Sequence, residues 1–134
     1  STLFPYTTLF RSGSQPSGRV HPRSLATLEQ AGIATHGLYS KGSEAFEGAP
    51  PDIVITVCDA AAGEACPLYL GAALKAHWGL ADPSALDGDE ALRDAAFHAT
   101  LARIEQRCRA FLGLPFATLD RDQLKRELER IGSL

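Results

Sequence analysis

The apolar positions of this chain fall into one continuous run and two helical stripes. Residues 53–57 form the run, five β-branched residues between Asp52 and Cys58. A short apolar run without alternation is typical of a strand buried on both faces, as in a parallel sheet covered by helices. Such sheets hold their functional residues just beyond the carboxyl ends of their strands. Because Cys58 stands there, the pattern predicts a thiol where an α/β sheet places its active site.

The longer stripe predicts a helix over residues 89–111. Its apolar residues recur at spacings of four, three, four and three, the period of one helix face: Phe97, Leu101, Ile104, Cys108 and Phe111. Gly113 and Pro115 come next and are expected to end this helix. On this stripe, Cys108 is expected to pack in the core as a small apolar side chain.

The shorter stripe predicts a final helix that begins after Asp120. Asp120 and Gln123 have the spacing of a capping box, in which each residue satisfies a backbone N–H near the other. Gly132 is expected to close the helix. Three residues form its apolar face: Leu124, Leu128 and Ile131.

Weaker patterns predict the remaining elements. A helix is expected to begin near Pro22 and to end at Gly32, with Ile33 as the apolar contact after it. Three short elements are also expected: a strand near residues 37–39, a helical turn near Phe46, and a last strand over residues 77–80. The alternation of strands and helices favours one α/β domain with a C-terminal helical extension.

Composition narrows the class of protein. The chain has 134 residues, 45% hydrophobic and 22% charged, with a net charge of −3, as expected for a single soluble globular domain. The basic residues are scattered, which argues against a nucleic-acid partner. No apolar run reaches the length of a membrane span. Three cysteines, an odd number, favour a reducing compartment, and we expect a cytoplasmic protein.

Residues 1–12 differ in character from the rest of the chain. They contain two of the six Phe, no acidic residue, and Pro5 within an otherwise strand-like apolar segment. The chain also contains no Met. We expect this segment to be foreign to the domain, with an ordinary edge strand as the alternative.

Cys58 and Cys66 are the first candidates for chemistry. In a helix, eight residues would separate their Cα atoms by about 12 Å, whereas a disulfide needs them within roughly 6–7 Å. The small residues between them would allow unwinding, so a redox pair that changes local structure is one interpretation. Two buried small apolar side chains are the other. A metal site made of Cys58, Cys66 and His77 is less favoured, because zinc ligands usually include closely spaced pairs.

Asp82 is the second candidate, in an Asp-Pro turn. A carboxyl group there can act as a general acid if partial burial near Trp78 raises its pKa; otherwise Asp82 is a turn or cap residue. The other histidines are expected to be exposed or to lie on helix surfaces: His21, His36 and His98.

One expected motif is absent from the sequence. A thiolate nucleophile that binds an oxyanion calls for Cys-x₅-Arg, in which backbone N–H groups and the arginine surround the anion. Six residues beyond the three cysteines stand Glu64, Ala72 and Leu114. No glycine-rich phosphate loop occurs either.

From Gly13 onward the sequence resembles the arsenate reductases built on the low-molecular-weight protein tyrosine phosphatase fold. The resemblance rests on GSQPSGRVHPRSLATLEQAGI, PDIVITVCDAAAGEACP, AHWGLADPS and AFHATLARIEQRCRAFL, and it covers about nine tenths of the chain. It implies a three-layer α/β fold with an open parallel sheet, here incomplete at the N-terminus, and a C-terminal helix. It also implies domain limits: residues 1–12 foreign, 13–114 the arsenate reductase domain, and 115–134 the helical extension.

The resemblance further implies a mechanism. A thiolate in the phosphate loop attacks arsenate, and Asp82 matches the general acid that protonates the leaving oxygen. Cys58 matches a second cysteine that attacks the first and releases arsenite. Cys66 matches a third that attacks the second, and thioredoxin or a similar dithiol reduces the resulting disulfide. No bound cofactor or metal is expected, and a monomer is expected.

The sequence departs from this family in lacking the first strand and the Cys-x₅-Arg loop before Gly13. Without them we expect poorly covered apolar surface on Ile53 and Ile55, and no arsenate reductase activity from the chain itself. Two alternatives stay open. One is a phosphatase that hydrolyses phosphomonoesters, and the other is a redox-responsive binding module without a substrate.

Overall fold

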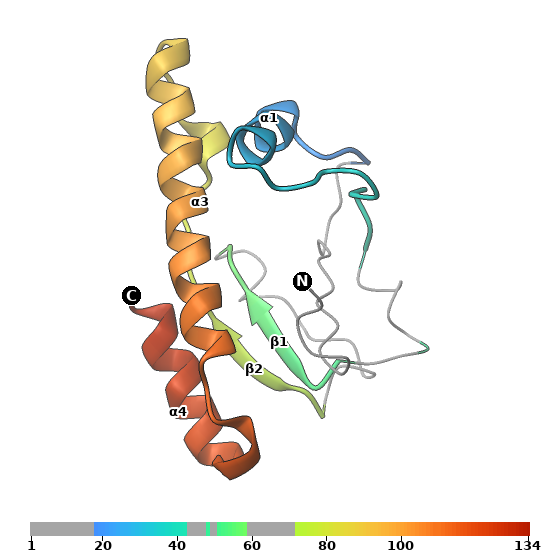
Figure 1. The fold of residues 1–134 in the computed structure, drawn as a ribbon, viewed down its shortest axis with the longest axis vertical. Coiled ribbons are helices and arrows are strands. Elements are labelled where there is room, and N and C mark those ends of the chain that lie inside the picture. Colours follow the sequence, from blue (N-terminus) through green and yellow to red (C-terminus); the bar gives the residue numbers. More distant parts are fainter. Residues whose placement is uncertain (1–17, 43–47, 49–50, 59–71) are drawn as a thin grey trace.

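The computed structural model describes residues 18–42, 48, 51–58 and 72–134, and they form an α/β arrangement (Figure 1). Strands β1 (Ile53–Thr56) and β2 (Leu74–His77) run parallel, with Ile53 opposite Leu74. Their pairing continues past the last strand residues, since the Trp78 N–H donates to the Thr56 carbonyl at 2.8 Å. Both strands therefore end at the same edge, as the α/β prediction requires.

The helices among the described residues are α1 (Pro22–Gln30), α3 (Glu90–Leu112) and α4 (Arg121–Gly132). The same residues include the short 3₁₀ helices η3 (Pro83–Ala85) and η4 (Phe116–Thr118). Figure 1 shows α3 as the long axis of the structure, with α1 beside its N-terminal half and α4 beside its C-terminal half. Helix α4 packs against β2, and α1 packs against α3.

The helix ends confirm the predicted caps. Asp120 accepts a hydrogen bond from the Gln123 N–H at 2.8 Å, and the Gln123 side chain accepts from the Asp120 N–H at 3.0 Å. At the end of α1, Gly32 has φ +76°, and the Ile33 N–H reaches back to the Leu28 carbonyl at 2.9 Å. This is the Schellman arrangement, which needs a left-handed residue and therefore favours glycine.

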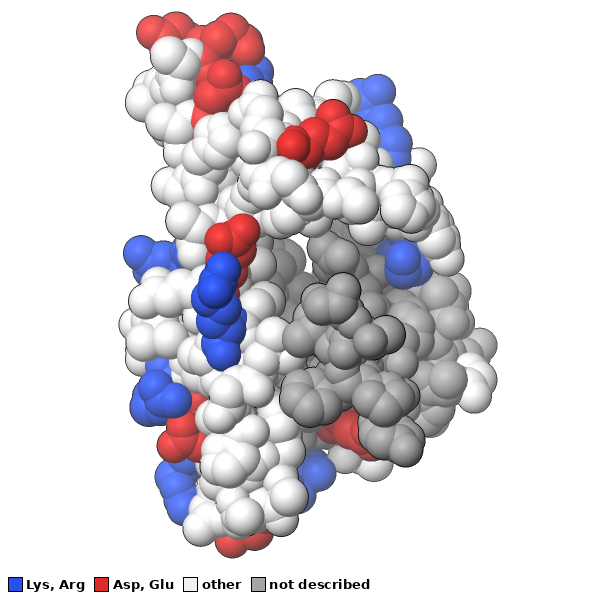
Figure 2. Space-filling model, in the orientation of Figure 1, with Lys and Arg blue, Asp and Glu red and all other residues white. Residues whose placement is uncertain are grey.

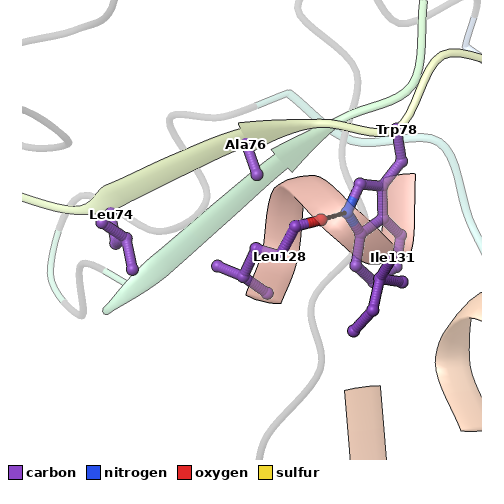
Figure 3. Packing of buried hydrophobic residues seen from close by; sticks show 5 residues of the cluster. All are labelled: Leu74, Ala76, Trp78, Leu128 and Ile131. Atoms are coloured by element: carbon purple, nitrogen blue, oxygen red, sulfur yellow. Dashed lines mark hydrogen bonds between the residues drawn. The ribbon is translucent and has the colours of Figure 1, made fainter. Parts of the chain in front are cut away.

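The apolar core lies between β2 and α4 (Figure 3). Its buried members come from both elements and from the residue after β2: Leu74, Ala76, Trp78, Leu128 and Ile131. Leu128 and Ile131 are 0% exposed, as their stripe predicts. The indole N–H of Trp78 donates to the Leu128 carbonyl at 2.8 Å, so the buried ring has its polar group satisfied.

Strand β1 is shorter and less buried than the apolar run at residues 53–57 predicts. Strand β1 ends at Thr56, its four residues are half-buried, and Val57 is 48% exposed. Both strands of the described two-stranded sheet are edge strands, and among the described helices α4 packs against β2, which leaves β1 less covered. Ile53 and Ile55 are nevertheless packed against the core cluster, so their apolar surface is better covered than we expected.

The predicted last strand over residues 77–80 is displaced. The strand occupies residues 74–77 instead, and its side chains alternate between core and outside, with Trp78 continuing the inward set. The apolar residues Leu74, Ala76 and Trp78 alternate with other residues, and this alternation predicts the observed strand better. A period of two is typical of a strand with one buried face. Residues 37–39 form no strand, because the chain turns at Gly37, where φ is +80°. Phe46 lies outside the described residues.

Gly132 has a different role from the one predicted. It is the last residue of α4, and Ser133 forms the C-cap. A Cβ atom on Gly132 would lie 2.8 Å from Trp78 Cδ1 and 2.9 Å from the His77 carbonyl oxygen. The glycine therefore permits close approach between α4 and the end of β2.

The stripe on α3 is only partly buried. Phe97 is buried, whereas Cys108 and Phe111 are half-buried and Ile104 is 39% exposed. Figure 2 shows Lys and Arg interspersed with Asp and Glu over the visible face, rather than collected in a basic patch. Within the described part of the chain, no helix has both the length and the apolar character to cross a membrane.

Candidate functional site

A pocket of about 430 Å³ opens at the carboxyl ends of the two strands. Its described lining comes from α1 and its N-cap, the two residues after β1, the segment from Leu80 into η3, and the middle of α3. Cys58 and Asp82, which are far apart in the sequence, both line this pocket. This is the edge where an open parallel sheet is expected to hold a site.

Backbone pairing beyond the strands brings these segments together. After Trp78 pairs with Thr56, the Leu80 N–H donates to the Val57 carbonyl at 2.8 Å. The residues after β2 therefore run beside the residues after β1. Asp82 comes two positions after Leu80, and Cys58 comes directly after Val57.

Arg107 holds the same connection from the side of α3. Its guanidinium donates to the carbonyls of Trp78 at 3.0 Å and Gly79 at 3.2 Å, and to Leu134 at 3.2 Å. The residue is 4% exposed, and its burial, with Arg103 nearby, lowers the pKa of its guanidinium. The positive charge is thus used to fix the backbone that leads to Asp82, and it does not face the pocket.

Cys58 is exposed and lines the pocket, rather than being a buried small apolar residue. Cys66 lies outside the described residues, so the predicted pair is observed at one member only. Cys108 is half-buried in α3 and is not among the residues that line the pocket.

His77, the third member of the metal alternative, is at the end of β2. Its Nδ1 lies 2.8 Å from Thr56 Oγ1, across the paired strands, and it does not line the pocket. Among the described residues, no group of three or more His, Cys, Asp or Glu side chains could hold a metal ion.

Asp82 is an exposed N-cap residue of η3 rather than a carboxyl group buried near Trp78. Its Oδ1 accepts two hydrogen bonds from Ser84, one from the hydroxyl at 2.6 Å and one from the backbone N–H at 2.9 Å. These bonds, above all that from the hydroxyl, lower the pKa of Asp82, and the charge of His21 adds to the effect. The cap alternative for Asp82 is therefore confirmed. The condition for a general acid, a pKa raised by burial, is not met, because donors to the charged form outweigh desolvation.

His21 is a pocket residue that the sequence did not single out. It is exposed, as predicted, but it also lines the pocket, and its ring lies against Phe97 with centroids 5.3 Å apart. Its Nδ1 accepts a hydrogen bond from the Arg23 N–H at 3.1 Å, which caps α1. His21 directly before Pro22 could have indicated this cap in the sequence, because the residue before a helix often accepts a hydrogen bond with its side chain.

The rest of the pocket surface is mainly apolar. Thr27 and Thr100 line the pocket, but each hydroxyl donates a hydrogen bond to a backbone carbonyl of its own helix. Thr27 donates to Arg23 at 2.7 Å, and Thr100 donates to Ala96 at 2.9 Å. No Lys or Arg is among the described residues that line it. The described pocket therefore offers a thiol, a carboxylate and the imidazole of His21, but no Lys or Arg of the kind that closes an oxyanion site.

The fold and this pocket define an α/β protein with chemistry-bearing side chains at the carboxyl edge of a parallel sheet. The family model for low molecular weight phosphotyrosine protein phosphatases matches residues 11–129. The chain therefore belongs to the low molecular weight phosphotyrosine protein phosphatase family, whose members are generally enzymes. None of the curated proteins matches it.

Proposed function

We propose that this family member serves arsenate reduction, with Cys58 and Cys66 as the thiol relay and Asp82 as the proton donor, and that the 134 residues do not complete the reaction because they contain no nucleophile loop. The observation that carries the proposal is that Cys58 and Asp82 line one pocket at the carboxyl edge of the sheet. A phosphatase needs a nucleophile and an acid at such a site. Hydrolysis needs no thiol relay, so the Cys58 and Cys66 pair of the sequence favours electron transfer.

The proposed chemistry is a two-electron exchange. Two thiols become one disulfide and release two electrons and two protons, while arsenate loses one oxygen as water and becomes arsenite. Within the relay, the Cys58 thiolate attacks the sulfur that carries arsenic, and arsenite leaves with the electron pair. This attack leaves a disulfide between the nucleophile and Cys58. The Cys66 thiolate then attacks the Cys58 sulfur, which forms the Cys58–Cys66 disulfide and releases the nucleophile as a thiolate. Thioredoxin or a similar dithiol returns both thiols to the reduced state by exchange.

We expect no catalytic turnover from the 134 residues themselves. The sequence contains no Cys-x₅-Arg, and no Lys or Arg lines the described pocket, so the first attack on arsenate lacks its nucleophile and its anion site. Arsenate, thioredoxin, thioredoxin reductase and NADPH should therefore give NADPH oxidation no faster than without the chain. Sustained arsenate-dependent oxidation would contradict this expectation.

The relay itself can be tested separately. Mild oxidation should make the chain lighter by two hydrogens, and cleavage after Glu64 should then yield the Cys58 and Cys66 peptides joined by a disulfide. Cys58→Ser should abolish this species, whereas Cys108→Ser, the matched control outside the pocket, should leave it intact. A disulfide to Cys108, or none at all, would overturn the relay.

The phosphatase alternative is supported by the family match. In a variant that restores a nucleophile loop, it predicts hydrolysis of an aryl phosphate such as p-nitrophenyl phosphate, at a rate that does not change when Cys58→Ser and Cys66→Ser are added. A redox-responsive module would instead show the disulfide, with no effect of arsenate in any variant that restores a nucleophile loop.

A further inference from the structure

We propose that Ser84 is a positioning residue for Asp82: its two donors fix Oδ1 of the carboxylate, so that Oδ2 is the oxygen that carries the proton in the reaction. This inference rests on the proposed role of Asp82 as proton donor. It assigns a function to a residue that neither the sequence pattern nor the family match singles out.

The geometry separates the two carboxylate oxygens. Both hydrogen bonds from Ser84 end on Oδ1, the hydroxyl bond at 2.6 Å and the N–H bond at 2.9 Å. No hydrogen bond reaches Oδ2 from any other described residue. An oxygen that already accepts two hydrogen bonds is a poor site for a proton, so protonation is directed to Oδ2.

The backbone makes this arrangement rigid. Pro83 lies between the two residues at the first position of η3, where its fixed φ is suited to a helical turn, and the Ala85 N–H returns to the Asp82 carbonyl at 3.2 Å. Arg107 holds Trp78 and Gly79 upstream. Contacts before and after Asp82 in the chain therefore restrict its backbone. This restriction lowers the conformational entropy that the carboxyl group loses when it is positioned for proton transfer.

Few other charges act on Asp82. From α1, His21 lines the pocket and lowers the pKa of Asp82 through its charge. From the segment after β1, Cys58 lines the pocket and is the other titratable group there. Helix α3 packs against η3 but presents no charged side chain to the described pocket, only Phe97, Thr100, Leu101 and Ile104. The hydrogen bonds from Ser84 lower the pKa of Asp82 most; they outweigh the opposing effect of burial, and the charge of His21 adds less.

The test is a carboxyl titration of the whole chain by ¹³C NMR, with Asp82→Asn to assign the signal. Ser84→Ala removes the hydroxyl donor and keeps the backbone donor, so the midpoint of Asp82 should move to higher pH. Ser84→Thr restores a hydroxyl and should return the midpoint close to that of the parent chain. His21→Asn, which keeps a side-chain acceptor for the α1 cap, should give a smaller upward movement than Ser84→Ala.

The result that would overturn the inference is an unchanged midpoint in Ser84→Ala, in a variant whose amide spectrum still shows α3 and α4 folded. An equal upward movement in Ser84→Thr would also overturn it, since the hydroxyl would then not be the cause. The titration requires no turnover, so its failure leaves the Cys58–Cys66 disulfide test standing. Failure of that disulfide test equally leaves the titration readable.

Discussion

Single residues decide how closely the elements approach one another, and Gly132 is the clearest case. A helical glycine is normally a weak point, and replacing it with alanine usually stabilises the fold. At Gly132 the added Cβ would meet Trp78 Cδ1 at 2.8 Å and a backbone oxygen at 2.9 Å. The indole is itself held by a hydrogen bond to Leu128, so it cannot move aside without breaking that bond.

Gly132→Ala should therefore destabilise the chain, by about 1–3 kcal/mol, the usual effect of overpacking a core. Gly113→Ala is the matched control, because its Cβ would meet only backbone oxygens at 3.6 Å, an ordinary contact. That variant should be neutral or more stable by up to about 1 kcal/mol. Urea unfolding followed by circular dichroism measures both, and equal effects at the two glycines would contradict this explanation.

Arg107 is a buried cation that stabilises the backbone of a neighbouring segment. It binds two carbonyls of the segment that leads to Asp82, and its Nε has no hydrogen-bond partner in the described structure. Arg107→Met should lower the free energy of unfolding by about 1–3 kcal/mol, because it leaves buried carbonyl oxygens without donors. Arg109→Met, an exposed position on the same helix, should change it by about 0.5 kcal/mol or less. A stable Arg107→Met variant would show that other contacts fix this segment.

At the scale of elements, local sequence signals determine the helices well. Caps and stripes are read from residues three or four positions apart, which is why α1, α3 and α4 begin and end within about two residues of their predicted limits. The strands were less predictable. Their burial depends on partners far away in sequence, so the run at residues 53–57 suggested a depth that β1 does not have.

The capping box of α4 gives a prediction at this scale. Asp120→Ala removes the acceptor for the Gln123 N–H and should lower stability by about 0.5–2 kcal/mol. Because α4 contributes Leu128 and Ile131 to the core, the loss should appear as a lower midpoint of the whole unfolding transition. Asp120→Asn retains a side-chain acceptor and should stay close to the parent chain. A low-temperature transition confined to α4 would contradict this coupling.

At the scale of the molecule, the sequence predicted where the site lies but missed part of its chemistry. The place of Cys58 just beyond a strand and the turn at Asp82 could be read from neighbouring residues, whereas their meeting in one pocket could not. His21 and Ser84 were missed, since their importance arises from the pocket that α1 and η3 complete in space. The sequence left open whether the pKa of Asp82 is raised, because no pattern indicated that Ser84 would donate twice to its carboxylate and lower that pKa.

The arrangement of the whole molecule also distinguishes an accessible thiol from a packed one. Cys58 comes after a strand and is exposed in the pocket, whereas Cys108 is half-buried on the helix stripe. Thiol exchange requires access of the attacking thiolate to a disulfide sulfur. We therefore assign electron transfer to the segment that contains Cys58 and Cys66, and packing to Cys108.

The most direct test of that assignment is the reduction of the oxidised chain by thioredoxin, measured through NADPH in the presence of thioredoxin reductase. We predict about one NADPH consumed per oxidised chain, since one disulfide takes two electrons. The same value is expected for Cys108→Ser, and none for Cys58→Ser. Equal consumption by the parent chain and Cys58→Ser would contradict the relay, because the electrons would then enter at another site.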